Sequence, residues 1–328
     1  MKLEHNYTII DKVRIHYVES GLANDPLNNA KPTMIFLHGF PEYWGSWAQQ
    51  LDFFAKEYRV IAPDLPGYNL SDKPADLDFY AVPNLINFIA KFIKVISPTK
   101  PVILVAHDWG GAIAWPLTAF KPQLVSQLII LNAAHPSTFT REMISNPLQR
   151  QKSAYIHQLI GPQGESFLSR DNFKYLKDDV MVSCNNKVFD HQKMTDYQQA
   201  WQQAGAITGM LQYYRAMPQL AANEEPIQTD NQTKLDPQLN ESKLNNRQLN
   251  QTSPVKATSS IKIPNIRINV PTLILWGEAD LAFVNDNLTG IEQYVADVTV
   301  KRFANTSHWL QHERPDEVNQ AINCFIKS

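Results

Sequence analysis

The run Val102-Ile103-Leu104-Val105-Ala106-His107-Asp108-Trp109-Gly110-Gly111 decides how this chain folds. Its first half is apolar and rich in β-branched residues, which predicts a buried strand. The strand stops at Asp108, and a segment compatible with a helix follows. A strand, a tight turn with the pattern small-x-nucleophile-x-Gly and a helix are together typical of a nucleophile elbow. We therefore predict that Asp108 is presented as a nucleophile at the end of a buried strand.

A carboxylate at the nucleophile position restricts the chemistry that the site can perform. Attack by Asp108 on a saturated carbon can displace a halide or open an epoxide, which leaves an alkyl ester on the enzyme. Attack on the carbonyl of an ester or amide would instead produce a labile anhydride. Ordinary acyl hydrolysis is therefore not expected.

Length and composition limit the fold and the partners of the chain. Its 328 residues are enough for one large α/β domain, or for a core with an inserted subdomain. The formal net charge is -2 and no dense basic block is present, so neither nucleic acid nor a membrane surface is an expected partner. Cys184 and Cys324 lie far apart and suggest neither a disulfide framework nor a metal site. With no apolar signal core or membrane-spanning run, the expected location is the cytoplasm.

Strand-like runs alternate with helical patterns, which predicts a mostly parallel sheet covered on both faces. The predicted strands cover residues 7–10, 13–18, 34–37, 59–62, 102–106, 128–131, 272–276 and 298–303. Glycine and polar residues gather where these strands end. In open α/β sheets that carboxyl edge is where ligands bind.

The alternation stops in the middle of the chain, where residues 153–159 and 196–214 read as helices. We interpret residues 137–264 as a helical cap inserted after the sixth strand. The core then consists of two parts, residues 1–136 and residues 265–328.

One part of this cap has a different composition. Residues 223–260 are rich in Asn, Gln, Ser, Thr and Lys and contain neither glycine nor an aromatic residue. Such a segment buries little apolar surface, so we expect it to be flexible.

Five short motifs follow one another at the ends of predicted strands. They are His38-Gly39-Phe40-Pro41-Glu42, Asp64-Leu65-Pro66-Gly67-Tyr68, His107-Asp108-Trp109-Gly110-Gly111, Gly277-Glu278-Ala279-Asp280 and Ser307-His308-Trp309. Their order of nucleophile, acid and histidine resembles the α/β-hydrolase fold and, within it, the epoxide hydrolases with an Asp nucleophile. The resemblance covers nearly the whole chain except the polar insertion. It implies an eight-stranded, mostly parallel sheet with a helical cap, and an enzyme without a cofactor or metal.

The resemblance also implies a role for each motif. Asp108 would attack the substrate, and His308, with an intrinsic pKa of about 6.5, would activate the water that hydrolyses the ester. Asp280 would hold the other ring nitrogen of His308 and fix its tautomer. Backbone amides of Phe40 and Trp109 would stabilise the oxyanion that forms on the side chain of Asp108.

The leaving group separates epoxide hydrolases from haloalkane dehalogenases, which share this nucleophile and histidine. An epoxide oxygen needs an acid, and two phenols that stay protonated at neutral pH can hold it and supply a proton. Two segments resemble the corresponding cap segments of epoxide hydrolases, Ala154-Tyr155-Ile156 and Gln212-Tyr213-Tyr214-Arg215. Adjacent helical residues point about 100° apart, so Tyr213 and Tyr214 cannot both face one pocket. The family pattern selects Tyr214, with Tyr155 as its partner.

Other residues have less specific predictions. His38, His107 and His135 are expected to support turns through hydrogen bonds. The residues predicted to line a substrate pocket are Trp44, Leu211, Phe283 and Trp309. Leu211 and Tyr214 also fit an apolar helical stripe, which is more often part of a core than of a site.

The predicted function is therefore hydrolysis of epoxides to vicinal diols. The partners would be a small-molecule epoxide and water, and the assembly a monomer or homodimer. A haloalkane or haloacid dehalogenase is the alternative, although Phe40 stands where many haloalkane dehalogenases carry an Asn that holds halide. A ligand-binding receptor with this fold is a third possibility, but it would leave the acid–base residues unused.

Overall fold

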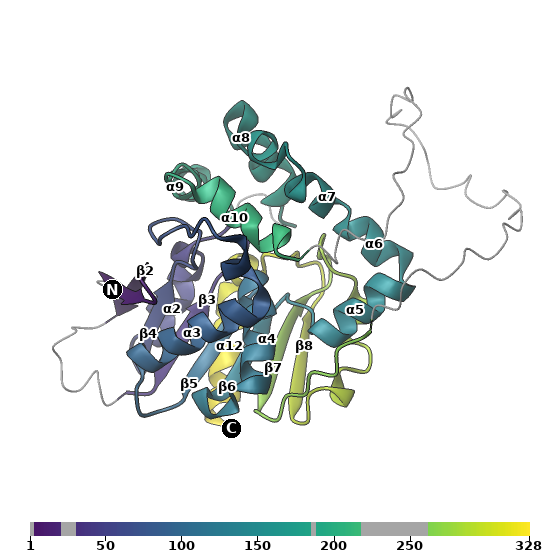
Figure 1. The fold of residues 1–328 in the computed structure, drawn as a ribbon. Coiled ribbons are helices and arrows are strands. Elements are labelled where there is room, and N and C mark those ends of the chain that lie inside the picture. The colour runs from purple at the N-terminus through teal and green to yellow at the C-terminus, as the bar shows by residue number, and fades with distance from the viewer. Residues whose placement is uncertain (1–2, 21–30, 185–187, 218–261) are drawn as a thin grey trace, which may run out of the picture.

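The computed structural model describes residues 3–20, 31–184, 188–217 and 262–328. Figure 1 shows a sheet with helices packed against it and a second group of helices, teal to green, above one edge of the sheet. The polar segment predicted at residues 223–260 lies outside the described residues.

Eight strands form a single sheet: β1 (Leu3–Ile10), β2 (Val13–Ser20), β3 (Thr33–Leu37), β4 (Arg59–Pro63), β5 (Val102–His107), β6 (Val125–Leu131), β7 (Thr272–Gly277) and β8 (Val298–Phe303). Their order across the sheet is β1-β2-β4-β3-β5-β6-β7-β8. The pairs β1–β2 and β2–β4 are antiparallel, and the remaining pairs are parallel. The predicted eight-stranded, mostly parallel sheet is confirmed.

Two apolar cores lie on the two faces of the sheet. In β5, Leu104 and Ala106 belong to the core that includes α3 (Val82–Ile96) and α4 (Trp109–Phe120). Their neighbours in the same strand, Ile103 and Val105, belong to the core that includes α2 (Ala48–Phe54) and α12 (Pro315–Lys327). Because both faces are covered, β5 is apolar at every position from Val102 to Ala106 rather than at alternate ones. This burial fixes the strand that carries Asp108 in the middle of the sheet.

The helices between β6 and β7 lie above the carboxyl edge of the sheet (Figure 1). They are α5 (Pro136–Ser145), α6 (Pro147–Ser153), α7 (Tyr155–Ile160), α8 (Gly164–Tyr175), the π-helical turn η4 (Leu176–Val180), α9 (His191–Trp201) and α10 (Ala206–Arg215). Their position in the sequence is that of the predicted cap. After β8, the short helix α11 (Leu310–Glu313) leads into α12.

The prediction of one continuous helix over residues 196–214 is wrong, because the structure has two helices there. The segment is divided into α9 and α10, because Gly205 has a φ of 74° and ends helical continuity before α10 begins. The helix predicted at 153–159 is also divided, since α6 ends at Ser153 and α7 begins at Tyr155.

Hydrogen bonds fasten these helices to the loops at the carboxyl edge of the sheet. The indole N–H of Trp201 donates to the carbonyl of Pro41 at 2.6 Å, and the Tyr213 hydroxyl donates to the carbonyl of Pro66 at 2.8 Å. The backbones of Gly67 and Gly209 also touch, since a Cβ atom added to Gly209 would lie 2.4 Å from the Gly67 carbonyl oxygen. These contacts place α10, and therefore Tyr214, directly over the strand ends.

Candidate active site

Five neighbouring parallel strands bring their carboxyl ends together at one edge of the sheet. In spatial order, β3, β5, β6, β7 and β8 are followed in the chain by Phe40, Asp108, Asn132, Asp280 and His308. Residues that are up to 268 positions apart in sequence therefore meet at one place. The topology, rather than local sequence, assembles the site.

The backbone at Asp108 makes a sharp turn between β5 and α4. Asp108 has a φ of 48° and a ψ of -117°, a conformation that is costly for a residue with a Cβ atom. The turn also needs Gly110, since a Cβ atom there would lie 2.3 Å from the Leu37 carbonyl oxygen. The result is a carboxylate held above the N-terminus of α4, where the helix dipole favours negative charge.

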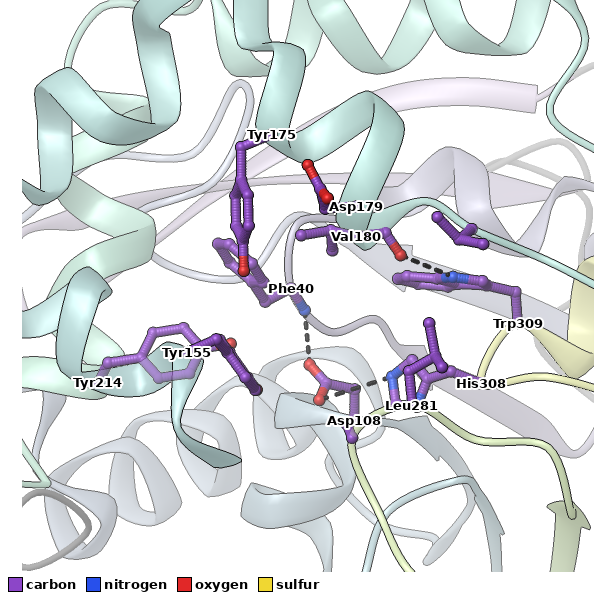
Figure 2. Close-up of a pocket in the computed structure, with 12 residues that line it drawn as sticks. Phe40, Asp108, Tyr155, Tyr175, Asp179, Val180, Tyr214, Leu281, His308 and Trp309 are labelled. Carbon is purple, nitrogen blue, oxygen red and sulfur yellow. Dashed lines mark hydrogen bonds and ion pairs between the residues drawn. The ribbon is translucent and has the colours of Figure 1, made fainter. Parts of the chain in front are cut away.

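The predicted oxyanion hole lies beside this carboxylate. The backbone N–H of Phe40 donates to Oδ1 of Asp108 at 2.7 Å (Figure 2). Trp109 is the first residue of α4, so its backbone N–H has no acceptor within the helix. The Phe40 amide is thus at the carboxylate on which the resemblance predicts an oxyanion, and the Trp109 amide is free of helical partners next to it in the chain.

His308 lies between two carboxylates. Its Nδ1 is 2.8 Å from Oδ2 of Asp280, and its Nε2 is 3.8 Å from Oδ2 of Asp108. The other Asp280 oxygen accepts the backbone N–H of Ala282 at 2.6 Å. Asn132 donates to Oδ2 of Asp280 at 2.5 Å, so the carboxylate is held on both sides.

This arrangement shifts the pKa values of His308 and Asp280. Burial alone would lower the pKa of His308, but the carboxylates of Asp280 and Asp108 outweigh it and raise the pKa to about 9. Burial would raise the pKa of Asp280, but His308 and the hydrogen bond from Asn132 outweigh it and lower that pKa. The pair is therefore stabilised as imidazolium and carboxylate.

The two predicted phenols lie on the other side of Asp108 from His308 (Figure 2). Tyr155 and Tyr214 come from α7 and α10, and their ring centroids are 6.2 Å apart. Burial, followed by the nearby Asp108 carboxylate, raises the pKa of Tyr155, and burial also raises the pKa of Tyr214. Both side chains therefore stay protonated and can donate a hydrogen bond or a proton.

Two chambers lie on either side of the nucleophile and share part of their lining. The smaller has a volume of about 90 Å³ and the larger about 380 Å³. Both are lined by Asp108, Tyr155, Tyr214 and Ala282, so the predicted nucleophile and acids stand at the junction. A substrate that reacts at Asp108 can therefore place one substituent in each chamber.

The structure brings only two of the four predicted pocket residues to these chambers. Phe283 lines the larger chamber and Trp309 the smaller one. The prediction for Trp44 is wrong, because its ring packs against His5 and Tyr43, at centroid distances of 5.5 and 5.7 Å, and lines neither chamber.

The prediction for Leu211 as a pocket residue is also wrong. Leu211 is fully buried where α10 packs on α8, and its Cδ1 would lie 3.2 Å from a Cβ atom on Gly164. Tyr214, three residues later, is turned toward Asp108 and does line the chambers. On the stripe that they share, Leu211 therefore belongs to the core and Tyr214 to the site.

Sequence reasoning missed a buried hydrogen-bond network behind the histidine. Glu42 accepts the backbone N–H of Gly39 at 2.8 Å and bonds to Nδ1 of His107 at 2.7 Å. The other ring nitrogen of His107 lies 3.0 Å from the His308 carbonyl oxygen. Glu42 stands in one of the five motifs, but nothing in the sequence showed that its partner would be His107.

His38 and His135, which were also predicted to support turns, make local hydrogen bonds as well. Nε2 of His38 accepts the backbone N–H of Leu65 at 2.9 Å, and Nδ1 of His135 accepts that of Ser137 at 3.2 Å. Both acceptor nitrogens are therefore unprotonated. This agrees with the burial of the two rings, which lowers the pKa of each. Neither side chain lines the two chambers.

Two further lining residues carried no signal in the sequence. Tyr175 at the end of α8 and Asp179 in η4 line the smaller chamber. They come from a part of the chain that was not predicted as any element.

In the described part of the chain, no three His, Cys, Asp or Glu side chains are grouped so that they could hold a metal ion. Nor is any described helix both long enough and apolar enough to cross a bilayer.

Comparison with protein families gives one match that covers most of the chain. The model of the alpha/beta hydrolase fold family matches residues 32–315. This interval contains all five motifs and the helices between β6 and β7.

Individual relatives are similar over nearly the full length. The chain is 33% identical to epoxide hydrolase 3 of Xenopus tropicalis, over 96% of this chain and 75% of that protein. It is 31% identical to epoxide hydrolase 4 of Homo sapiens, over 96% of this chain and 76% of that protein. Among solved structures, a Bacillus megaterium epoxide hydrolase bound to an inhibitor superposes with a TM-score of 0.77 at 30% identity. That alignment covers 98% of this chain and 100% of the other.

Proposed function

Since this chain belongs to the alpha/beta hydrolase fold family and, within it, to the epoxide hydrolases, we propose that it converts epoxides to vicinal diols through an ester on Asp108. It is accordingly a hydrolase that acts on ether bonds. The observation that carries the proposal is the junction of the two chambers, where Asp108 faces two protonated phenols. An epoxide at this junction has a nucleophile on one side and acids on the other.

The first step forms the ester. An oxygen of Asp108 attacks one ring carbon, the bond from that carbon to the ring oxygen breaks, and its electron pair stays on the oxygen. Tyr155 and Tyr214 hold this oxygen, and one of them donates the proton that converts it to a hydroxyl. Because Phe40 already binds Oδ1 of Asp108, the free Oδ2 is the oxygen that attacks.

The second step clears the ester with water. His308 takes a proton from a water molecule, and the hydroxide attacks the carboxyl carbon of Asp108. The oxyanion that forms accepts hydrogen bonds from the amides of Phe40 and Trp109, each of which is worth about 3 kcal/mol of barrier. When the ester bond breaks, His308 returns its proton to the departing alkoxide, and the proton left on the Asp108 carboxyl then passes to His308, which restores the carboxylate and the imidazolium.

The charge on His308 has to change between these steps. Before the first step, Asp108 and Asp280 both hold His308 as the imidazolium, with a pKa of about 9. Esterification removes the charge of Asp108, and the pKa of His308 then falls because one of the two carboxylates no longer stabilises the cation. Formation of the ester therefore prepares His308 to act as a base: the imidazolium gives up its proton, and this proton restores the tyrosine that protonated the ring oxygen.

The dehalogenase alternative uses the same nucleophile and histidine but needs no acid for its leaving group. The paired phenols favour an epoxide, because they supply the proton that an alkoxide leaving group requires. The relatives with this function agree with that choice. We also propose that the enzyme acts in the cytoplasm on a small-molecule epoxide, as a monomer or homodimer.

Two assays test the reaction. Incubation with styrene oxide and, separately, with a bromoalkane should release diol from the first and no bromide from the second. A single turnover in heavy-oxygen water should put the label into the protein and leave the first diol unlabelled. Bromide without diol would overturn the substrate, and label in the first diol would overturn the ester.

A further inference from the structure

The smaller chamber carries a negative charge of its own, away from the nucleophile. Figure 2 shows Tyr175 and Asp179 on the side of the chamber opposite Asp108. Among the described residues that line the smaller chamber, none is Lys or Arg. The imidazolium of His308 is also a lining group, but it is already paired with Asp280 at 2.8 Å and faces Asp108 at 3.8 Å.

The turn that carries Asp179 is fixed to the core. The indole N–H of Trp309 donates to the carbonyl of Val180 at 3.1 Å, next in the chain to Asp179 (Figure 2). A backbone hydrogen bond from Met181 to Leu176, 2.9 Å long, closes the π-helical turn. Single π-helical turns of this kind are frequent at functional sites. Asp179 is therefore held at the chamber by the residue that follows the catalytic histidine.

Tyr175 adds no charge to the chamber. Burial and the neighbouring Asp179 carboxylate raise the pKa of Tyr175 to about 12, so its phenol stays protonated near neutral pH. Its ring packs against Phe167 with 4.4 Å between centroids, and its hydroxyl points into the chamber (Figure 2).

The larger chamber has a different character. Asp108, at the junction, is the one charged residue of its described lining. The rest is mainly apolar and includes Ile86, Trp109, Phe139, Ile156, Ile266 and Phe283. An uncharged, bulky group suits this chamber, which has about four times the volume of the other.

We propose that Asp179 determines specificity: the enzyme prefers epoxides with a bulky apolar group on one carbon and a cationic or neutral group on the other, and it discriminates against carboxylates. The apolar group occupies the larger chamber, and the second group extends past Tyr175 toward Asp179. A carboxylate there would face Asp179 and Asp108 with no free cation in the described lining. The inference rests on the proposed epoxide hydrolysis and specifies its substrate class.

Three matched substrates test the proposal. Each is a trans-epoxide with a phenyl group on one carbon, and the other carbon carries CH₂–N(CH₃)₃⁺, CH₂–C(CH₃)₃ or CH₂–COO⁻. The first two have the same shape and differ in charge. For the wild-type enzyme, kcat/KM for diol formation should decrease in the order cation, neutral, anion.

The variant Asp179→Asn removes the charge and keeps the size of the side chain. Relative to the neutral substrate, kcat/KM should fall about fivefold for the cation and rise about fivefold for the anion. That is the factor expected for two unit charges about 4 Å apart in water. Since the Asp179 side chain is exposed, added salt should reduce the wild-type preference.

Asp178→Asn is the matched control. Asp178 belongs to the same turn and is also exposed, but it pairs with Lys174 and does not line the chamber. Its removal should leave the order and the ratios of the three substrates unchanged. Unchanged ratios in Asp179→Asn, or an equal change in both variants, would overturn the role of Asp179.

Styrene oxide separates failure of this inference from failure of the proposed function. If the wild-type enzyme hydrolyses styrene oxide but prefers the anion, or treats the three substrates alike, only the inference on specificity is wrong. If it hydrolyses neither styrene oxide nor any of the three matched substrates, both the proposed function and the inference on specificity are wrong.

Discussion

Nε2 of His308 lies 3.8 Å from Oδ2 of Asp108, whereas its Nδ1 is 2.8 Å from Oδ2 of Asp280. The first distance is too long for a hydrogen bond and the second is a good one. The imidazole is therefore anchored by Asp280 and only approaches Asp108, so it leaves Oδ2 free to attack. Geometry of this kind suits a histidine that acts on water after the ester has formed.

The two-step scheme makes a direct prediction for His308→Gln. Alkylation of Asp108 does not need a base, but hydrolysis of the ester does. The variant should therefore accumulate a covalent adduct with the mass of one substrate molecule, which intact-protein mass spectrometry would detect. The double variant Asp108→Asn, His308→Gln should show no adduct. Turnover by unmodified His308→Gln would contradict the scheme.

The phenol pair gives a second prediction. Tyr155→Phe and Tyr214→Phe should each slow alkylation, and the double variant should lose about 10²–10⁴-fold, the usual contribution of a general acid. Stopped-flow measurement of a single turnover would follow this step. Tyr80→Phe is a matched control, since the Tyr80 hydroxyl is buried without a hydrogen-bond partner among the described residues and Tyr80 lines neither chamber. A wild-type alkylation rate in the double variant would remove both phenols from the mechanism.

Local sequence patterns predicted the sheet because its strands carry strong signals. Strand β5 is apolar from Val102 to Ala106 and ends at a turn that needs glycine, so Asp108 could be placed without any tertiary information. The same holds for Asp280, which follows the buried strand β7, whereas His308 follows β8, in which apolar and polar residues mix. These positions depend on strand order and hardly at all on side-chain packing.

The pocket residues could not be predicted as well, because packing between distant elements decides them. Leu211 and Tyr214 share one helical stripe, and only the contact of α10 with α8 buries the first and leaves the second beside Asp108. Trp44 follows a strand that ends at the site, but its loop turns the ring toward the N-terminal hairpin. Asp179 stands in a π-helical turn, for which the sequence offers no periodic pattern.

The raised pKa of His308 predicts how stability depends on pH. The folded state favours the imidazolium, with a pKa of about 9 against an ordinary value of 6.5. This contribution, about 3 kcal/mol, is therefore fully present below pH 6.5 and is lost as the pH rises through 9. Urea unfolding at pH 6, 7.5 and 9.5 would measure it. The difference in unfolding free energy between wild type and His308→Gln should shrink across this range, and a constant difference would contradict the raised pKa.

The close contact between Gly67 and Gly209 predicts how the cap positions Tyr214. In Gly209→Ala the new Cβ atom would meet the Gly67 carbonyl oxygen at 2.4 Å, so α10 has to move away from the core. Overpacking of this kind costs about 1–3 kcal/mol of stability, and the displaced helix carries Tyr214 with it. The alkylation rate should therefore fall even in the fraction that remains folded, as single turnovers at low temperature would show. Thr208→Ala, at the neighbouring exposed position of α10, should leave that rate unchanged. A normal rate in Gly209→Ala would mean that Tyr214 keeps its place without this contact.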